Sequence, residues 1–544
     1  MSHARPPRAL PHPALAELRR DWRSGGMGRR EFLARATALG VSAAAFGPLP
    51  RAAAQDAPGS VIRIQMRVMP QGDPRLWDFT EMSNACAGLL DTLVRAESDG
   101  RLAGALLESW ETAPDAASYV LHLRPDVTWS NGDAFTAEDV AANFEGWCDR
   151  TIPGNSMASR LPALIDPATD RLRAGAVTIL DPHTVRLELS APDITLVPGL
   201  SDYPAAVMHR SAIGENPLDR QIGTGAYRIA EYLPGVRAVL ERDPERHPWR
   251  PGHVDRIEFV DLGPDPASAA AAAEAGEIDV NYDTIGAYVS VLDGLGWVRS
   301  EVDTSATIVL RASQAHEMGG FRPYGDLRVR QALQLAVDNG VLLELGYDGR
   351  GLVAENHHVS PMHPAYAKIA QPKQDVAEAR RLMDEAGLLE FEHELVSIDD
   401  DWRRFTTDVM AAQLRDAGFK VKRIILPAAE YNAGWKDFAF SSTNWNAREL
   451  GVQVLDLAYR SGAAWNETGF ADPEFDTLLD RAKGLPGAEE RREVMRQLEQ
   501  RMRDQAVIVQ PYWRRLMRHA RPGVIGAERG HKDMIDVHAL ALAG

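Results

Sequence analysis

The C-terminal half of this sequence repeats one order of elements, in which a helical pattern ends at a glycine and a strand follows. Gly387 separates a helical segment from a strand near residues 391–396. Gly418 separates the helical segment 402–417 from the strand 419–425. Glycine is common just after the last helical turn because it adopts the left-handed conformation there at little cost. The alternation of helices and strands predicts an α/β fold with layered, at least partly parallel sheets.

The size and charge of the chain narrow its class further. At about 100–200 residues per domain, the 544 residues correspond to two or three lobes, each large enough for its own core. The formal net charge of −17 argues against a nucleic-acid partner, which requires a basic surface. Two cysteines, Cys86 and Cys148, are too few for a disulfide scaffold, an iron–sulfur cluster or a cysteine-rich zinc site.

The first 54 residues differ in composition from the rest. They hold nine arginines and three acidic residues, so the remaining chain carries a charge of −23. Arg29-Arg30 precedes an uncharged stretch, residues 36–50, which is shorter than the roughly 20 residues of a membrane span. The three alanines before Gln55 provide the small side chains that a signal peptidase requires.

This N-terminal pattern resembles a twin-arginine (Tat) signal peptide. It predicts cleavage near Ala54-Gln55 and a soluble, periplasmic protein. The alternative is a basic amphipathic arm on a cytoplasmic protein.

Two helix starts are well marked in the sequence. Thr136 and Asp139 have the spacing of a capping box, in which the two residues satisfy each other's main-chain N–H groups. Asp265, followed by proline, opens an alanine-rich helix that Gly276 closes. Residues 118–123 alternate polar and apolar side chains and predict a strand.

Motifs for catalysis are missing from the sequence: it has no G-x-S-x-G, H-E-x-x-H, P-loop or G-x-G-x-x-G pattern. The segment 223–227 predicts a tight turn rather than a phosphate cradle. His357, His358 and His363 could ligate a transition metal, or they could form hydrogen bonds in a surface loop. We therefore predict no enzyme activity, no cofactor and no metal site.

Three tryptophans, Trp435, Trp445 and Trp465, fall in a stretch rich in Asn and Ser. A single such ring is often a core residue. Several amphipathic rings beside amide side chains are typical of a ligand pocket.

Several segments, in one order along the chain, resemble a known family. The first block comprises residues 107–110, 119–129 and 131–140, and later matches are residues 223–227, 276–279, 326–333 and 472–476. Together they extend from about residue 61 to the end. In this order they resemble the family 5 extracytoplasmic solute-binding proteins of ABC importers, the dipeptide, oligopeptide and nickel-binding group.

The resemblance implies a two-lobed periplasmic-binding-protein (Venus-flytrap) fold with mixed sheets. Such a protein encloses a small solute between its lobes and delivers it to an ABC permease in the inner membrane, as a monomer and without nucleic acid. Lobe I would combine residues 55–95, 203–300 and 508–544, with a subdomain at residues 96–202. Lobe II would comprise residues 301–507. Hinge closure around a ligand is a common motion of such proteins.

The resemblance also implies a place for the solute. In peptide-binding members, an Asp three residues after a Trp in the second lobe holds the ammonium group of the peptide. If Trp445 corresponds to that Trp, then Arg448 stands in place of the Asp and would pair with a carboxylate or phosphate. Glu449 is the alternative amine anchor, and a surface position of Arg448 is a third possibility. The predicted ligand-binding residues are Trp445, Asn446, Arg448, Glu449, Trp465 and Asn466.

The predicted solute is a peptide or a peptide-like, carboxylate-bearing molecule. An anionic non-peptide solute and a nickel chelate are alternatives within the same fold. A Tat-exported cofactor enzyme is an alternative of a different class.

The two cysteines are predicted to form a disulfide. The oxidising periplasm permits a bond between Cys86 and Cys148. The alternative is a pair of buried, unreactive thiols, because each cysteine lies in an apolar helical pattern.

Overall fold

The computed structural model describes residues 59–543 except 98–99, 247 and 371–372. Residues 55–544 form one compact unit. The predicted signal peptide and its cleavage site after Ala54 lie outside the described residues. None of the described helices combines the length and the apolar character that crossing a membrane requires.

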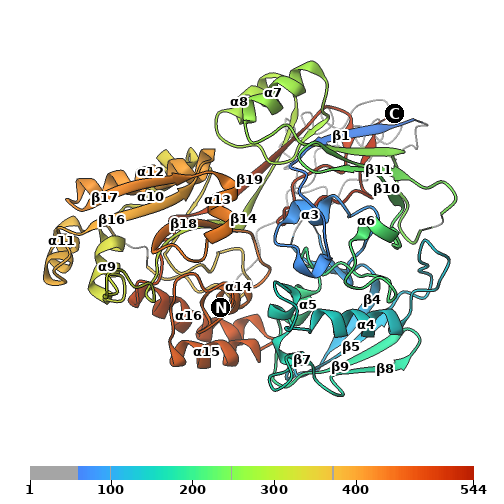
Figure 1. Ribbon diagram of the computed structural model, residues 1–544, viewed down its shortest axis with the longest axis horizontal. Helices are drawn as coiled ribbons and strands as arrows, with labels where there is room; N and C mark the ends of the chain where they lie inside the picture. Colours follow the sequence, from blue (N-terminus) through green and yellow to red (C-terminus); the bar gives the residue numbers. More distant parts are fainter. Residues whose placement is uncertain (1–58, 98–99, 247, 371–372, 544) are drawn as a thin grey trace, which may run out of the picture. The chain divides into compact units, whose positions relative to one another are not determined.

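An 11-stranded mixed sheet runs through the protein (Figure 1). Strands β1 and β12 are parallel, as are β16 and β17, whereas β10 and β11 are antiparallel. The prediction of a mixed, partly parallel sheet is therefore confirmed. Its order is β10 (Tyr227–Leu233), β11 (Arg237–Arg242), β12 (Arg256–Val260), β1 (Val61–Gln65), β13 (Val280–Asn281), β19 (Tyr512–Ala520), β14 (Val298–Ala312), β18 (Phe440–Trp445), β16 (Glu392–Ile398) and β17 (Lys420–Leu426), and β15 (Gly351–Val353) pairs with β19.

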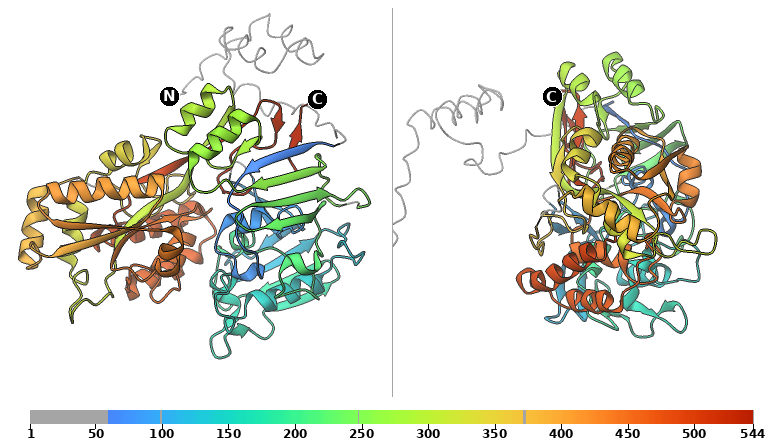
Figure 2. Two further views of the ribbon diagram at one scale, coloured as in Figure 1. Left: turned by 45° about the horizontal axis from the view of Figure 1, so that its top comes forward. Right: turned by 90° about the vertical axis from the view of Figure 1, so that its left-hand side faces the viewer.

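Strands β14 and β19 connect the two halves of this sheet (Figure 2). The first part of β14 pairs with β19 from Val298 to Asp303, and its last part pairs with β18 from Thr307 to Ala312. Strand β19 also pairs with β13 on its other side. The chain therefore passes between the two halves of the sheet along these two strands.

The hydrophobic core consists of separate clusters, as expected for a protein with two lobes and a subdomain. One cluster joins residues 62–90, 203–282 and 520–540, and we call this part lobe I. A second cluster, within residues 93–207, is the core of the subdomain. Two large clusters within residues 309–509 form lobe II. The boundary residues named above stay predictions.

The subdomain has a sheet of its own, built from β4 (Leu107–Thr112), β5 (Ser118–Leu123), β9 (Thr184–Glu188) and β8 (Val177–Asp181). The predicted capping box starts the helix α4 (Ala137–Trp147): the N–H of Thr136 donates to Asp139 Oδ2 at 3.0 Å. Three small sheets complete the strands: β2 (Val94–Ala96) with β3 (Leu102–Gly104), β6 (Ile165–Asp166) with β7 (Arg171–Leu172), and β20 (Val524–Ile525) with β21 (Ala541–Leu542).

Aspartate side chains begin several of the helices. Asp265, Asp326, Asp375, Asp400 and Asp472 each accept a main-chain N–H in the first turn that follows. The remaining α-helices of the described residues are α3 (Thr80–Asn84), α5 (Leu196–Gly199), α6 (Pro217–Arg220), α7 (Pro266–Ala275), α8 (Tyr288–Gly294), α9 (Leu327–Leu335), α10 (Asn339–Tyr347), α11 (Val376–Glu385), α12 (Asp401–Asp416), α13 (Ala428–Gly434), α14 (Gly451–Tyr459), α15 (Pro473–Lys483) and α16 (Ala488–Asp504).

The glycines of the segment 223–227 allow two main chains to approach closely. A Cβ atom would lie 2.0 Å from Leu89 O at Gly223 and 2.1 Å from Gly88 O at Gly225. The N–H of Gly225 donates to Leu89 O at 3.0 Å. These glycines therefore serve packing within lobe I.

The predicted disulfide is wrong. Cys86 and Cys148 are both free and buried. Cys86 packs in the core of lobe I, whereas Cys148 packs in the core of the subdomain, so the two thiols belong to different clusters. Burial raises the pKa of each thiol to about 12, which keeps both protonated and unreactive at neutral pH.

The three clustered histidines are buried instead of lying in a surface loop. His358 bonds the hydroxyl of Tyr459 at 2.6 Å, and His363 bonds Arg448 O at 3.2 Å. Burial lowers the pKa of His357 to about 3 and that of His363 to about 4, so both are neutral. Among the described residues, no three His, Cys, Asp or Glu side chains gather as a metal site. These histidines therefore belong to the core of lobe II.

Candidate ligand-binding site

A cavity of about 1080 Å³ is lined by residues of lobe I, the subdomain and lobe II. This volume is at the upper end of the range for small-molecule sites. Lobe I contributes Asp78 and Phe79, which precede α3. The subdomain contributes the loop 150–163 and residues 190–193, and lobe II contributes residues from β18, α14 and α15.

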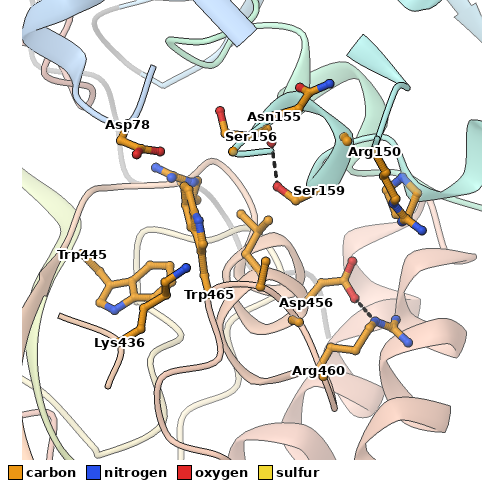
Figure 3. A pocket seen from close by; sticks show the side chains of 18 of the residues that line it. Asp78, Arg150, Asn155, Ser156, Ser159, Lys436, Trp445, Asp456, Arg460 and Trp465 are labelled. Atoms are coloured by element: carbon orange, nitrogen blue, oxygen red, sulfur yellow. Dashed lines mark hydrogen bonds and ion pairs between the residues drawn. The ribbon is translucent and has the colours of Figure 1, made fainter. Parts of the chain in front are cut away.

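All three tryptophans of the Asn- and Ser-rich stretch line this cavity. The rings of Trp445 and Trp465 meet edge to face, with centroids 5.9 Å apart. The indole N–H of Trp445 donates to Glu467 Oε1 at 3.0 Å, and the same carboxylate accepts Arg311 Nε at 2.7 Å. A buried ion pair, Arg311 with Glu467, therefore fixes the indole of Trp445. Figure 3 shows the rings of Trp445 and Trp465.

Arg448 lines the cavity but already has a protein counter-ion. Its Nη2 lies 3.8 Å from Asp202 Oδ2, and Arg160 Nε donates to the same oxygen at 2.7 Å. Burial opposes the charge of Asp202, but Arg160, Arg448 and Lys532 hold its pKa well below the usual value. Two guanidinium groups thus share one carboxylate, and Arg448 Nε has no acceptor among the described residues.

Glu449 and Asn466, two other predicted ligand-binding residues, do not line the cavity. Lys532 Nζ of lobe I lies 2.5 Å from Glu449 Oε1. The amide of Asn466 donates to Arg460 O at 3.0 Å and to Phe470 O at 2.7 Å, which fixes its own loop. Asn446 does line the cavity, and its Nδ2 donates to Thr80 Oγ1 of lobe I at 3.4 Å.

A second ionic cluster lies between the subdomain and lobe II. Lys483 Nζ lies 2.9 Å from Asp193 Oδ2 and 2.8 Å from Asp456 Oδ2. Arg460 pairs with Asp456 and also with Asp480, the latter at 2.7 Å. These carboxylates and cations satisfy one another, so this cluster joins the two parts of the protein.

Sequence reasoning missed several side chains that line the cavity. Asp78 and Lys436 come from opposite lobes, and Arg150 comes from the subdomain. They lie far from Trp445 and Trp465 in the sequence or carry no motif, so no local signal marks them. Only the pairing of distant segments brings them together.

The arrangement suits binding of a polar solute. Aromatic rings and charged groups from several elements line one space, which is what orientation and specificity of a ligand require.

The family model of the bacterial extracellular solute-binding proteins, family 5 (middle part), matches residues 101–463. The periplasmic oligopeptide-binding protein OppA of Haemophilus influenzae is 24% identical over 458 residues, which cover 77% of this chain and 81% of that protein. The matched region includes the subdomain and most of lobe II.

Solved structures show the same fold. The binding protein AgaA of A. tumefaciens R10, in complex with agropinic acid, has a TM-score of 0.74 and 20% identity, covering 86% of this chain and 94% of that one. The murein tripeptide binding protein MppA of Escherichia coli has a TM-score of 0.78 and 17% identity, covering 90% of this chain and 99% of that one. The predicted two-lobed fold with mixed sheets is thereby confirmed.

Proposed function

This chain belongs to the bacterial extracellular solute-binding proteins of family 5, and we propose that it is the solute-binding component of an ABC importer. It encloses a peptide or peptide-like solute between its lobes and delivers the solute to the membrane permease. Relatives named for oligopeptides and di- or tripeptides support a peptide-like solute.

The observation that carries this proposal is a free strand edge in the cavity wall. Strand β18 pairs with β14 along its whole length but with β16 only at Ser441. Among the described residues, no strand therefore pairs with the other edge of β18 at Thr443–Trp445, and these residues line the cavity. An extended peptide can bond the main-chain groups of such an edge.

The charges around Asp202 favour a solute that carries a carboxylate. Arg160 and Arg448 both face this one side chain, so positive charge is in excess there, and the buried Arg448 lines the cavity. The same excess favours an anionic non-peptide solute as a second candidate. A carboxylate of either solute would provide the missing acceptor for Arg448.

Matched peptides test this function. We expect tri-alanine to raise the melting temperature of the mature protein, because a ligand at 100 times its Kd stabilises the folded state by about 2.7 kcal/mol. We expect Arg448→Ala to weaken binding of tri-alanine by about 30-fold or more. The C-terminally amidated peptide should bind weakly to wild type and variant alike. Stabilisation by small dicarboxylates and by no peptide would favour the second candidate instead.

We further propose that the protein is exported through the Tat route and cleaved after Ala54. The paired Arg29-Arg30 and the alanines before Gln55 support this. N-terminal sequencing of periplasmic material should begin at Gln55. Replacement of both arginines by lysine should keep the protein in the cytoplasm, and normal export of that variant would contradict the proposed route.

A further inference from the structure

The acidic side chains that line the cavity differ in whether the protein neutralises them. Asp193 and Asp456 pair with Lys483, and Asp480 pairs with Arg460. Asp78 is different, because no hydrogen bond or ion pair to its carboxylate occurs among the described residues. The cavity thus presents one carboxylate without a bonded partner.

Asp78 lies at the aromatic end of the cavity. In the view of Figure 3, its side chain lies on the side of Trp445 and Lys436 and away from Asp456 and Arg460. The side chain is exposed to the cavity, but the surrounding walls remove water from it, and this desolvation raises its pKa, although the charges of Arg160 and Lys436 oppose the rise. A carboxylate in such a place is stabilised by a cation, and aromatic rings beside it add a favourable surface for that cation.

The protein's own cations near Asp78, Arg160 and Lys436, lower its pKa but form no ion pair or hydrogen bond with it. Arg160 donates to Asp202 Oδ2 and to Ser156 O, and its guanidinium lies over the rings of Tyr203 and Trp465 at 5.4 and 5.1 Å. Lys436 of lobe II also lines the cavity, but no ion pair joins it to Asp78 within 4.0 Å. Space for a cationic group therefore remains beside Asp78.

We propose that Asp78 binds an ammonium group of the solute, so that lobe I rather than lobe II recognises the amine. This inference rests on the proposed binding function and extends it, since it specifies a solute that carries a basic nitrogen as well as a carboxylate. The place three residues after Trp445 holds Arg448, a cation that shares the carboxylate of Asp202 with Arg160 and cannot bind an ammonium group. A zwitterionic solute would then bridge the lobes, with its amine on Asp78 and its carboxylate near Arg448.

Calorimetric titration of tri-alanine and N-acetyl-tri-alanine against wild type, Asp78→Asn and Asp126→Asn tests the proposal. Asp126 is an exposed aspartate of the subdomain that does not line the cavity, so its variant is the matched control. We expect wild type and Asp126→Asn to prefer the free amine by about 10- to 150-fold, the effect of a hydrogen bond to a charged group. Asp78→Asn should lose this preference and keep its melting temperature, because Asp78 makes no bond within the described residues.

Other results would overturn the inference. If Asp78→Asn weakens the free and the acetylated peptide equally, then Asp78 acts on Lys436 across the cavity and not on the amine. An unchanged preference in Asp78→Asn excludes any role in recognition.

Failure of both peptides to bind wild type would count against a peptide solute, and the inference is then decided by the solute that copurifies. Mass spectrometry should find a solute with a basic nitrogen on wild type and Asp126→Asn and its loss from Asp78→Asn. A solute without basic nitrogen, or its retention by Asp78→Asn, would contradict the inference.

Discussion

Replacement of Glu467 by alanine is expected to lower the free energy of unfolding by about 3–5 kcal/mol, as for other buried ion pairs that lose one partner. The carboxylate of Glu467 accepts Arg311 Nε at 2.7 Å, Thr443 Oγ1 at 2.7 Å and Trp445 Nε1 at 3.0 Å. Arg311 is fully buried, so the variant would leave its charge without a counter-ion. Chemical denaturation of the wild type and the variant measures this loss.

The same substitution should disturb the cavity. Because Glu467 fixes the indole of Trp445 and the hydroxyl of Thr443, both of which line the cavity, the variant should also bind the solute more weakly. Glu394→Ala is the control, since Glu394 pairs with Lys422 on an exposed face of the sheet. That pair should contribute less than about 1 kcal/mol. Equal losses of unfolding free energy in the two variants would show that the buried Glu467 pair stabilises the protein no more than an exposed pair does.

Local signals in the sequence were enough to predict several elements of the fold. The strand at residues 118–123 and the helix starts at Asp265 and Thr136 depend on side-chain alternation and on caps that neighbouring residues provide. Strand β13, by contrast, has two residues, and its length is set by its pairing with β1 and β19. Such pairing depends on residues more than 200 positions away.

In the site, too, some features follow from the local sequence and others depend on distant segments. The three tryptophans could be assigned to a cavity because their amphipathic rings cluster in one segment. The partners of Arg448 and Glu449 could not be predicted, since Asp202 and Lys532 come from distant segments that only the fold brings close. No sequence motif distinguishes Asp78 from the other aspartates. That its carboxylate has no bonded partner among the described residues follows only from the structure.

A buried acid in lobe II should make the stability of the protein depend on pH. Glu499, on α16, is fully buried, and its Oε2 has no hydrogen-bond partner among the described residues. Its other oxygen accepts the N–H of Ala367 at 3.3 Å. Burial, together with the nearby charge of Glu355, raises the pKa of Glu499 to about 9. The folded protein therefore holds a proton there at neutral pH.

The sign of the effect follows from proton binding. Between about pH 4.5 and pH 9 the folded state keeps the proton and the unfolded state releases it, so stability falls by about 1.4 kcal/mol per pH unit. Glutamine has the shape of a protonated glutamate but does not titrate. We expect Glu499→Gln to gain stability relative to wild type by about 3–4 kcal/mol between pH 5 and pH 8.

Urea unfolding of both proteins at pH 5, 6.5 and 8 measures this difference. The buried histidines of lobe II have the opposite effect, because they lower the stability of the folded protein as pH falls below about 6.5. They are present in both proteins, so their effect cancels in the difference. Glu489→Gln, at an exposed position of the same helix, should show no pH-dependent gain. A difference for Glu499→Gln that stays constant with pH would mean that Glu499 ionises in the folded protein, and that lobe II stabilises a buried carboxylate there.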